Sequence, residues 1–300
     1  MKRIAILILI ALISQAVFAQ TDVTSSSELV LQISTLPELK FAFTQNYTFP
    51  FMQGDSPLTE GNNINLALTG EITPITLNVN AKAVWTPIAF LQFSAGGLIG
   101  TGWNIGDDLT GIGLNTNVGD ASVRDGGAFD GIHYKALIGG TFQFDLAAIF
   151  PGEWNHVVFQ TYHEINYMGY SRASANQPWF YESDSGENMN GFSYYGNLVI
   201  GYQMPLFLNM VAFLAEANLN MYDTPGRTAW GDDLIRLTFS GILSFDITRQ
   251  FSAAVLVQFR TLRNFTEETK DLYYQNRVLK TDDKLRLEFF RVAAALTYKF

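Results

Sequence analysis

The sequence of 300 residues contains no cysteine and few charged side chains. The absence of Cys excludes disulfide bonds and thiolate metal sites. Charged residues make up 16% of the chain, whereas soluble domains carry about 25%. Beyond residue 19 the sequence has no run of ~18 apolar residues, which is the length that a membrane-spanning helix requires. A soluble α/β enzyme is therefore disfavoured, and a helical membrane protein is excluded.

Basic residues are also scarce relative to acidic ones. The chain has 28 acidic and 19 basic residues, which gives a net charge of −9. Nucleic-acid binding requires clustered Lys and Arg side chains that contact phosphates. We therefore expect no nucleic-acid partner. What the sequence does contain is 48% hydrophobic and 14% aromatic residues, spread in short alternating segments.

The N-terminal segment has the layout of a secretory signal peptide. Lys2 and Arg3 form a short basic region, residues 4–13 are apolar, and small residues precede a cleavage-type site after Ala19. This order of regions is typical of exported proteins. The sequence thus predicts a signal peptide over 1–19 and a single exported domain over 20–300.

Alternation of apolar and polar residues dominates this domain. In segment 233–247, Leu237, Phe239 and Leu243 share one parity, whereas Thr238 and Ser240 share the other. Successive side chains of a β-strand point to opposite faces, so a period of two indicates a strand with one apolar face. Repetition of this pattern along the chain predicts an all-β protein, namely a transmembrane antiparallel β-barrel.

The pattern predicts about ten strands joined by alternately short and long connections. First and last strands should pair, because an open edge in lipid would leave backbone groups without hydrogen bonds. Short turns are expected on the periplasmic side and long loops on the extracellular side. The expected strands are 28–49, 62–85, 88–103, 131–148, 155–171, 188–203, 207–223, 233–247, 250–265 and 285–300. The expected long loops are 50–61, 104–130, 172–187, 224–232 and 266–284.

The segment 62–85 changes its apolar parity at Pro74. Apolar residues such as Leu66 occupy even positions before Pro74, and residues such as Val79 occupy odd positions after it. One extra residue in a β-bulge would produce this change, and proline is tolerated at bulges. The alternative is a turn at Thr73-Pro74, which gives eleven strands. We prefer the bulge, because eleven strands would put loop 104–130 on the periplasmic side.

The last segment carries the only specific motif. It has an apolar or aromatic residue at every second position, namely Phe290, Val292, Ala294, Leu296, Tyr298 and Phe300. This motif resembles the C-terminal signal of bacterial outer-membrane β-barrel proteins, although no subfamily is matched. The resemblance implies that the chain contacts outer-membrane lipid and that Tyr298 and Phe300 are read by the barrel-assembly machinery during insertion.

Charged residues of the inward parity are the main candidate site. Acids and bases are nearly balanced among them, and unpaired charges in a narrow lumen are costly, so we expect them to pair. Two interpretations stay open: a plug of salt bridges that stiffens the barrel, or a polar conduit for a small solute. The predicted lumen residues are Glu38, Lys40, Glu71, Lys82, Lys135, Asp145, Glu164, Glu216, Arg236, Asp246, Arg260, Arg291 and Lys299.

Three arginines of this set are expected to form a basic stripe. Arg236, Arg260 and Arg291 fall on three consecutive predicted strands. The acids expected to face them are Glu164, Glu216 and Asp246. Opposed rows of this kind produce either a closed ladder or a constriction with a transverse field.

Catalytic and metal sites are not expected. A barrel of about ten strands resembles the omptin outer-membrane proteases, which use an Asp pair and an Asp–His pair at the rim. The acid pairs here are Asp107-Asp108 and Asp232-Asp233, and His133 lies near a strand end, but no Asp-x-His is present. No His has a Ser two residues away, as outer-membrane phospholipases require. Loop 104–130 is acidic but lacks a calcium-ligand register, so no metal or cofactor is predicted.

Aromatic residues are expected to form two belts at the membrane interfaces. The long-loop belt should include Phe49, Phe51, Trp103, Trp179, Phe180, Tyr181, Tyr222 and Trp230, and the short-turn belt should include Trp85, Phe150, Trp154, Tyr202, Phe207, Phe251, Tyr298 and Phe300. The leading functional hypothesis is a porin-like, non-enzymatic barrel, either a narrow small-solute channel or a structural surface barrel. The alternatives are an adhesin or partner-binding barrel that acts through its loops and, third, a rim hydrolase.

Overall fold

The structure is a computed structural model that describes residues 23–36, 38–103, 113–115, 128–182, 187–221, 226–266, 275 and 277–300. The predicted signal peptide, the pair Asp107-Asp108 and most of loop 104–130 lie outside the described residues.

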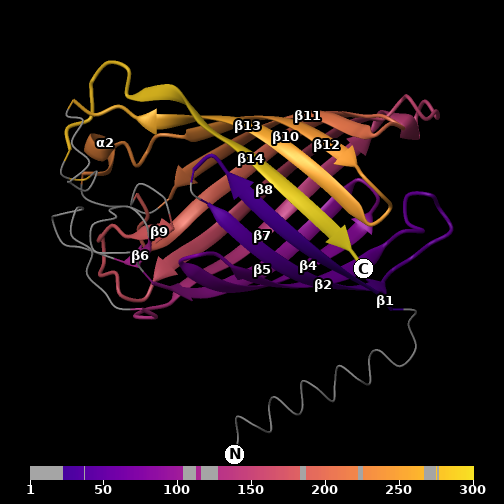
Figure 1. Cartoon of the computed structure of the whole chain (residues 1–300), viewed down its shortest axis with the longest axis horizontal. Helices are drawn as coiled ribbons and strands as arrows, with labels where there is room; N and C mark the ends of the chain where they lie inside the picture. Colours follow the sequence, from indigo (N-terminus) through magenta and orange to yellow (C-terminus); the bar gives the residue numbers. More distant parts are fainter. Residues whose placement is uncertain are drawn as a thin grey trace, which may run out of the picture.

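Twelve of the described strands form one closed antiparallel barrel (Figure 1). Each neighbours the next in the order β1, β14, β13, β12, β11, β10, β8, β7, β5, β4, β3 and β2, and β2 returns to β1. Alternating side chains give each strand one face toward the lumen and one toward the surroundings. The wall strands are β1 (Thr24–Ser34), β2 (Leu39–Pro50), β3 (Asn63–Ile72), β4 (Thr76–Ile88), β5 (Leu91–Gly102), β7 (His133–Asp145), β8 (Val157–Tyr170), β10 (Gly191–Gln203), β11 (Leu208–Asn220), β12 (Arg236–Asp246), β13 (Phe251–Arg263) and β14 (Leu285–Lys299).

The barrel closes between its first and last strands. β1 pairs with β14 from Glu28, opposite Lys299, to Ser34, opposite Ala293. The predicted closure is confirmed, and with it the antiparallel all-β class. Because the sheet is closed, its wall leaves no long open edge to be covered by another chain.

The predicted strand number of about ten is wrong, because two predicted strands are hairpins. Segment 28–49 contains β1 and β2, which are joined by a tight reversal in which Ser34 N–H donates to the Glu38 carbonyl over 3.2 Å. Segment 62–85 contains β3 and β4, and the hydroxyl of Thr73 accepts a hydrogen bond from Thr76 N–H over 2.9 Å at the turn between them. Each hairpin adds one strand, so the number stays even.

The predicted bulge at Pro74 is also wrong. Ile72 of β3 lies opposite Leu77 of β4 in an antiparallel register. Directly opposed residues share a face, so even positions of β3 and odd positions of β4 both face outward. The change of parity thus reflects a chain reversal. The second reversal, between β1 and β2, keeps the strand number even, so a turn at 73–75 is compatible with connection 103–132 at the loop end.

The two ends of the barrel differ in their connections. The terminal end holds both ends of the described chain and the connections 51–62, 89–90, 146–156, 204–207 and 247–250. The loop end holds the two hairpin turns, 35–38 and 73–75, and the connections 103–132, 171–190, 221–235 and 264–284. The grouping of 50–61 with the other long loops is therefore wrong, since it joins β2 to β3 at the terminal end. Connection 146–156 begins with the 3₁₀ turn η1 (Leu146–Ala148), and connection 221–235 contains the short helix α2 (Arg227–Trp230).

The outward face of the wall is apolar. Large hydrophobic side chains exposed on it include Leu29, Phe43, Leu68, Val79, Ile99, Ile138, Phe213 and Phe259. A membrane barrel presents such a face to the lipid acyl chains. None of the described helices has the length and hydropathy needed to cross a bilayer.

His163 is a polar exception on this face. Its ring nitrogens lie 2.6 Å from the Tyr194 hydroxyl and 3.0 Å from the Thr161 hydroxyl. Its cross-strand neighbours are Gly140 and Gly196, which leave room for the ring. The outward parity of His163 is thus accommodated by local hydrogen bonds.

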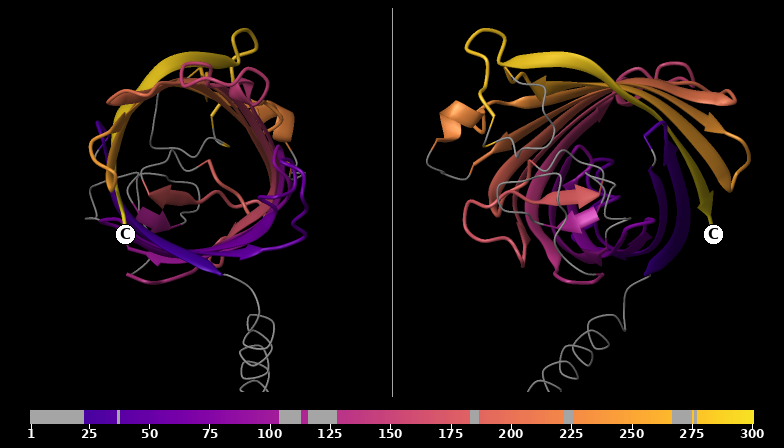
Figure 2. Two further views of the ribbon diagram at one scale, coloured as in Figure 1. Left: turned by 90° about the vertical axis from the view of Figure 1, so that its right-hand side faces the viewer. Right: turned by 60° about the vertical axis from the view of Figure 1, so that its left-hand side comes forward.

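A second, two-stranded sheet lies inside the barrel. It pairs β6 (Gly113–Asn115) with β9 (Phe180–Glu182), and Figure 2 shows both strands within the ring of the wall toward the loop end. Leu114, Tyr170 and Trp179 form a buried hydrophobic cluster beside it. We call this pair the inserted sheet. It arises because the connections after β5 and β8 turn inward and pair with each other.

The inserted sheet overturns part of the predicted aromatic belts. Trp179 and Phe180 are buried instead of facing a membrane interface. Phe49 and Phe51 of the same predicted belt lie at the terminal end, because β2 runs back to that end, and the Phe51 ring is 6.5 Å from that of Trp85. Tyr222 lies outside the described residues. Parity and loop position could not reveal that a loop aromatic folds back into the lumen.

Candidate functional site in the barrel lumen

The inserted sheet is hydrogen-bonded to the wall at β4. The hydroxyl of Thr76 donates to Glu182 Oε1 over 2.7 Å, and Asn78 Nδ2 donates to the Tyr181 hydroxyl over 2.8 Å. Thr76 and Asn78 are fully buried. A buried hydrogen bond is expensive to leave unmade, so these contacts hold the sheet against one side of the lumen.

Glu182 is placed where a carboxylate is disfavoured. Burial raises the pKa of this side chain, the hydrogen bond from Thr76 and the charge of Lys40 oppose the increase, and the carboxylates of Glu38 and Glu71 add to it. The protonated form of Glu182 is therefore favoured relative to an exposed Glu.

His133, which the sequence marks as a possible rim base, packs under the inserted sheet. Its ring centroid lies 4.5 Å from that of Tyr181 and 5.3 Å from that of Trp179. The side chain is 4% exposed, and its ring nitrogens have no hydrogen-bond partner among the described residues. This environment makes His133 part of an aromatic stack.

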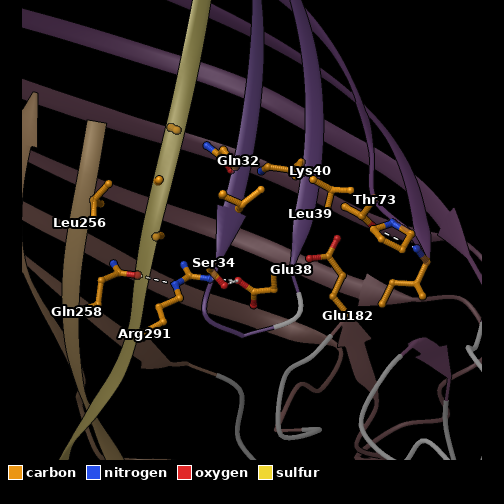
Figure 3. A pocket seen from close by; sticks show the side chains of 16 residues that line it. Gln32, Ser34, Glu38, Leu39, Lys40, Thr73, Glu182, Leu256, Gln258 and Arg291 are labelled. Atoms are coloured by element: carbon orange, nitrogen blue, oxygen red, sulfur yellow. Dashed lines mark hydrogen bonds and ion pairs between the residues drawn. The ribbon is translucent and has the colours of Figure 1, made fainter. Parts of the chain in front are cut away.

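Beside Glu182 lies a cavity of about 490 Å³, which we call the hairpin cavity. It is enclosed by the ends of the β1–β2 and β3–β4 hairpins and by β13 and β14 (Figure 3). Its lining mixes small apolar residues of β14 with charged and polar groups. The polar lining residues are Gln32, Ser34, Glu38, Lys40, Thr73, Glu182, Gln258 and Arg291.

A chain of hydrogen bonds runs around this side of the wall. Arg291 donates through Nη1 to Glu38 and through Nε to Gln258 Oε1, the latter over 2.6 Å. Gln258 Nε2 donates to the Ser240 hydroxyl over 2.9 Å, and the Ser34 hydroxyl donates to Glu38 Oε2 over 3.0 Å. The network links β12, β13 and β14 to the first hairpin, so it stiffens the closing seam.

A second cavity of about 310 Å³, which we call the arginine cavity, lies at the loop end. It contains two guanidinium groups, those of Arg236 and Arg260, among neutral polar and apolar neighbours. Other residues in its lining include Met168, Glu187, Asn188, Ser193, Asn218, Asn220, Thr238, Thr261 and Phe290.

Phe290 lines the arginine cavity, and it turns toward the lumen because of a bulge. The pairing of β13 with β14 shifts between Gln258 and Phe259, which leaves Phe290 unpaired. Its ring centroid lies 3.8 Å from the guanidinium carbon of Arg260 and 4.7 Å from that of Arg291. The expected outward position of Phe290 in the terminal motif is therefore wrong. A bulge commonly re-aims a side chain in this way.

Several predicted lumen charges do find partners within the lumen. Lys40 lies 3.5 Å from Glu71, and Lys135 lies 2.6 Å from Glu164. Lys82 lies 5.0 Å from the ring centroid of Tyr162, whose hydroxyl donates to Glu164 over 2.7 Å. The Tyr195 hydroxyl donates to Glu216, also over 2.7 Å.

Other predicted charges lie at the terminal end. Asp145 is 2.7 Å from His156 Nδ1 and also accepts a hydrogen bond from the Ala147 N–H. Asp246 and Lys299 are exposed there. These three residues are therefore separate from the two cavities.

The structure brings the three arginines of the predicted stripe together but gives them different partners. Arg236 and Arg260 line one cavity, and Arg260 and Arg291 contact the same Phe290 ring. Their ion-pair partners are Glu187 at 3.5 Å, Glu288 at 4.0 Å and Glu38, respectively. The predicted partners were Glu164, Glu216 and Asp246, and that pairing is wrong. Sequence parity gives the face of a residue but not its height in the lumen or the course of a loop.

One buried ion pair was missed by the sequence analysis. Arg263 Nη2 donates to Asp232 Oδ1 over 2.8 Å, and both side chains are almost fully buried. Arg263 Nη1 also lies 3.8 Å from Glu187. The acid pair Asp232-Asp233 is thus split, since Asp233 is exposed. A signal was present: Arg263 falls on the apolar parity of its strand, where a charge requires a partner.

The terminal motif supports a prediction about assembly. Phe300 is 68% exposed, its N–H donates to the Ser27 carbonyl, and its ring lies 4.7 Å from that of Tyr298. Because few contacts fix this ring, Phe300→Asp should reduce insertion while leaving export unaffected. Membrane fractionation and heat-modifiable migration on gels measure insertion. Phe150→Asp, which changes an aromatic that is 60% exposed in a turn, is the control; equal insertion of both variants would show that the terminal position has no special role.

No protein-family model matches the sequence, and no curated protein matches it. Several solved structures are similar at low sequence identity. The β domain of the Bordetella autotransporter Brka is 9% identical with a TM-score of 0.40, over 92% of this chain and 98% of that one. The NanC porin is 7% identical with a TM-score of 0.41, over 92% and 100% of the two chains. The transport unit of the autotransporter AIDA-I from Escherichia coli is 11% identical with a TM-score of 0.35, over 93% and 89%. Nothing about function follows from similarities of this size.

Proposed function

We propose that this protein is a bacterial outer-membrane barrel that passes small polar solutes through a lumen narrowed by the inserted sheet. The apolar outward face supports contact with outer-membrane lipid. The terminal end, which holds both ends of the described residues, fits the periplasmic side, and the loop end fits the cell exterior. In this proposal the barrel-assembly machinery inserts the chain after export.

One observation supports the proposal most directly: the inserted sheet is held inside the lumen, and open space remains beside it. Several lumen charges are paired with one another, such as Lys40 with Glu71 and Lys135 with Glu164, and open space remains in addition to these pairs. The hairpin cavity and the arginine cavity, of about 490 and 310 Å³, lie next to the inserted sheet and Phe290. A path for small solutes past the sheet fits this arrangement, whereas a lumen closed by salt bridges would leave no such space.

Single-channel recording tests the proposal. The purified barrel, folded in detergent and added to a planar lipid bilayer in potassium chloride, should give discrete conductance steps. Small nonelectrolytes that enter the lumen displace ions and should lower the current. Nonelectrolytes too large to enter should not lower it in this way. A heat-modifiable, fully folded protein that gives no steps would contradict a channel and leave the loop-mediated partner-binding hypothesis as the better one.

A rim hydrolase is the least favoured alternative. Its second acid pair is unsuitable, because the Asp232 carboxylate is buried against Arg263. His133 packs between aromatic rings, away from an exposed rim. We therefore do not propose a rim hydrolase.

A further inference from the structure

We propose that the arginine cavity is a binding subsite for small organic carboxylates, in which Arg236 and Arg260 hold the carboxylate group. This inference concerns the solute class and rests on the proposed channel. The cavity lies at the loop end. Residues of β10 to β13 line it, together with Glu187 from the connection between β8 and β10.

The charged side chains that line this cavity are Arg236, Arg260 and Glu187, whereas Glu288, which lies 4.0 Å from Arg260, is outside the lining. The side chains of Arg236 and Arg260 are 28% and 30% exposed, whereas that of Glu187 is 13% exposed. Glu187 is shared between Arg236 and the buried Arg263, at 3.5 and 3.8 Å. A solute that enters the cavity therefore meets two guanidinium groups and a carboxylate that is already engaged. An anion is favoured there over a cation.

Both guanidinium groups are held in position by neighbours. Arg236 Nη2 donates to Asn220 Oδ1 over 3.0 Å. The guanidinium of Arg260 packs on the Phe290 ring at 3.8 Å from its centroid, and Nε lies 4.0 Å from Glu288. A planar guanidinium offers parallel N–H donors that match the two oxygens of a carboxylate. Fixing its plane in advance lowers the entropy lost on binding.

The rest of the lining combines neutral polar residues with the apolar side chains Met168, Met189, Leu237, Leu262 and Phe290. Ser193, Asn218 and Thr238 add hydroxyl and amide groups to the cavity wall. Such groups accept and donate hydrogen bonds, so they suit a solute that carries hydroxyl groups beside its carboxylate. The volume of about 310 Å³ is at the small end of ligand pockets. These features favour a small hydroxylated carboxylate over a bulky or apolar anion.

Gluconate, a hydroxylated monocarboxylate, is the probe for this subsite. Calorimetry on the detergent-solubilised barrel should detect its binding, and Arg236→Gln or Arg260→Gln should weaken that binding by about tenfold, the loss of one charge-assisted contact. Glu187→Gln should strengthen it, because the competing carboxylate is removed while Asp232 still pairs with Arg263. Phe290→Leu should weaken binding without any change of charge, since Arg260 loses its platform.

Arg249→Gln is the matched control. It removes the same charge from an exposed turn at the terminal end, and it should bind gluconate as the unmodified protein does. Heat-modifiable migration establishes that each variant is folded. Equal affinity of Arg260→Gln and Arg249→Gln, or no gluconate binding at all, would overturn the subsite.

A bilayer measurement separates this inference from the proposed channel. If gluconate binds and the barrel also conducts, millimolar gluconate should reduce the chloride current, and Arg236→Gln should abolish the reduction. Binding without conductance would remove the channel and leave the subsite. Conductance with an arginine-independent effect of gluconate would leave the channel and remove the subsite.

Discussion

Asp232→Ala should destabilise the folded barrel by about 3–5 kcal/mol, the usual cost of removing one partner from a buried ion pair. Asp232 and Arg263 are almost fully buried and lie 2.8 Å apart. Without the carboxylate, the guanidinium keeps its charge in a poorly solvated position, because Glu187 at 3.8 Å is shared with Arg236. Urea unfolding in detergent, followed by tryptophan fluorescence, measures the change.

Two companion variants make this result specific. Asp233→Ala changes the adjacent, exposed carboxylate and should alter the unfolding free energy by no more than about 0.5 kcal/mol. Replacement of both partners, in Asp232→Leu with Arg263→Met, should cost less than Asp232→Ala alone, since no charge is then left unpaired. Equal destabilisation by Asp232→Ala and Asp233→Ala would show that the buried pair contributes nothing special.

Trp179→Ala should unseat the inserted sheet and increase the conductance of the barrel. Trp179 is fully buried next to Leu114 and Tyr170, and its ring lies 5.3 Å from that of His133. Removing a buried Trp side chain typically costs about 3–5 kcal/mol. That loss falls on the contacts that hold the sheet inside the lumen, so the narrowed path should widen. Single-channel recording reports the step size and its fluctuations.

The matched control for this variant is Trp154→Ala. Trp154 is exposed in the connection between β7 and β8 at the terminal end, so its removal should leave the conductance unchanged. A double variant that weakens the wall contacts, Thr76→Val with Asn78→Leu, should act in the same direction as Trp179→Ala. If neither Trp179→Ala nor the double variant alters the step size, the inserted sheet does not limit the path.

Strand faces could be predicted from the sequence because they depend on a local rule. Successive residues of a strand point to opposite sides, so Phe213, Phe239 and Phe259 could be assigned outward and Glu216 and Arg260 inward without any knowledge of neighbours. The same rule assigns His163 to the outward face, and hydrogen bonds to Tyr194 and Thr161 explain how it is tolerated there.

Strand number could not be predicted as reliably, because the turns responsible have weak signals. The reversals at 35–38 and 73–75 are short, and neither contains the Asn-Gly or Asp-Gly pair that marks many hairpins. Thr73 provides the turn contacts instead, through a hydroxyl that accepts from Thr76 N–H. A parity change at such a position fits a bulge as well as a turn, and only the pairing of Ile72 with Leu77 distinguishes them.

Local sequence patterns were sufficient to predict the all-β class, the closure of first on last strand and the inward parity of charged residues such as Glu164, Glu216 and Arg260. The partners of those charges and the filling of the lumen depend on the tertiary structure. Glu187 reaches Arg236 because a loop folds inward, β6 meets β9 from a distant loop, and Phe290 turns inward at a bulge whose register depends on the neighbouring strand. Faces follow from the backbone of one strand. Partners depend on stagger between strands and on loop paths, which are set by packing across the whole barrel.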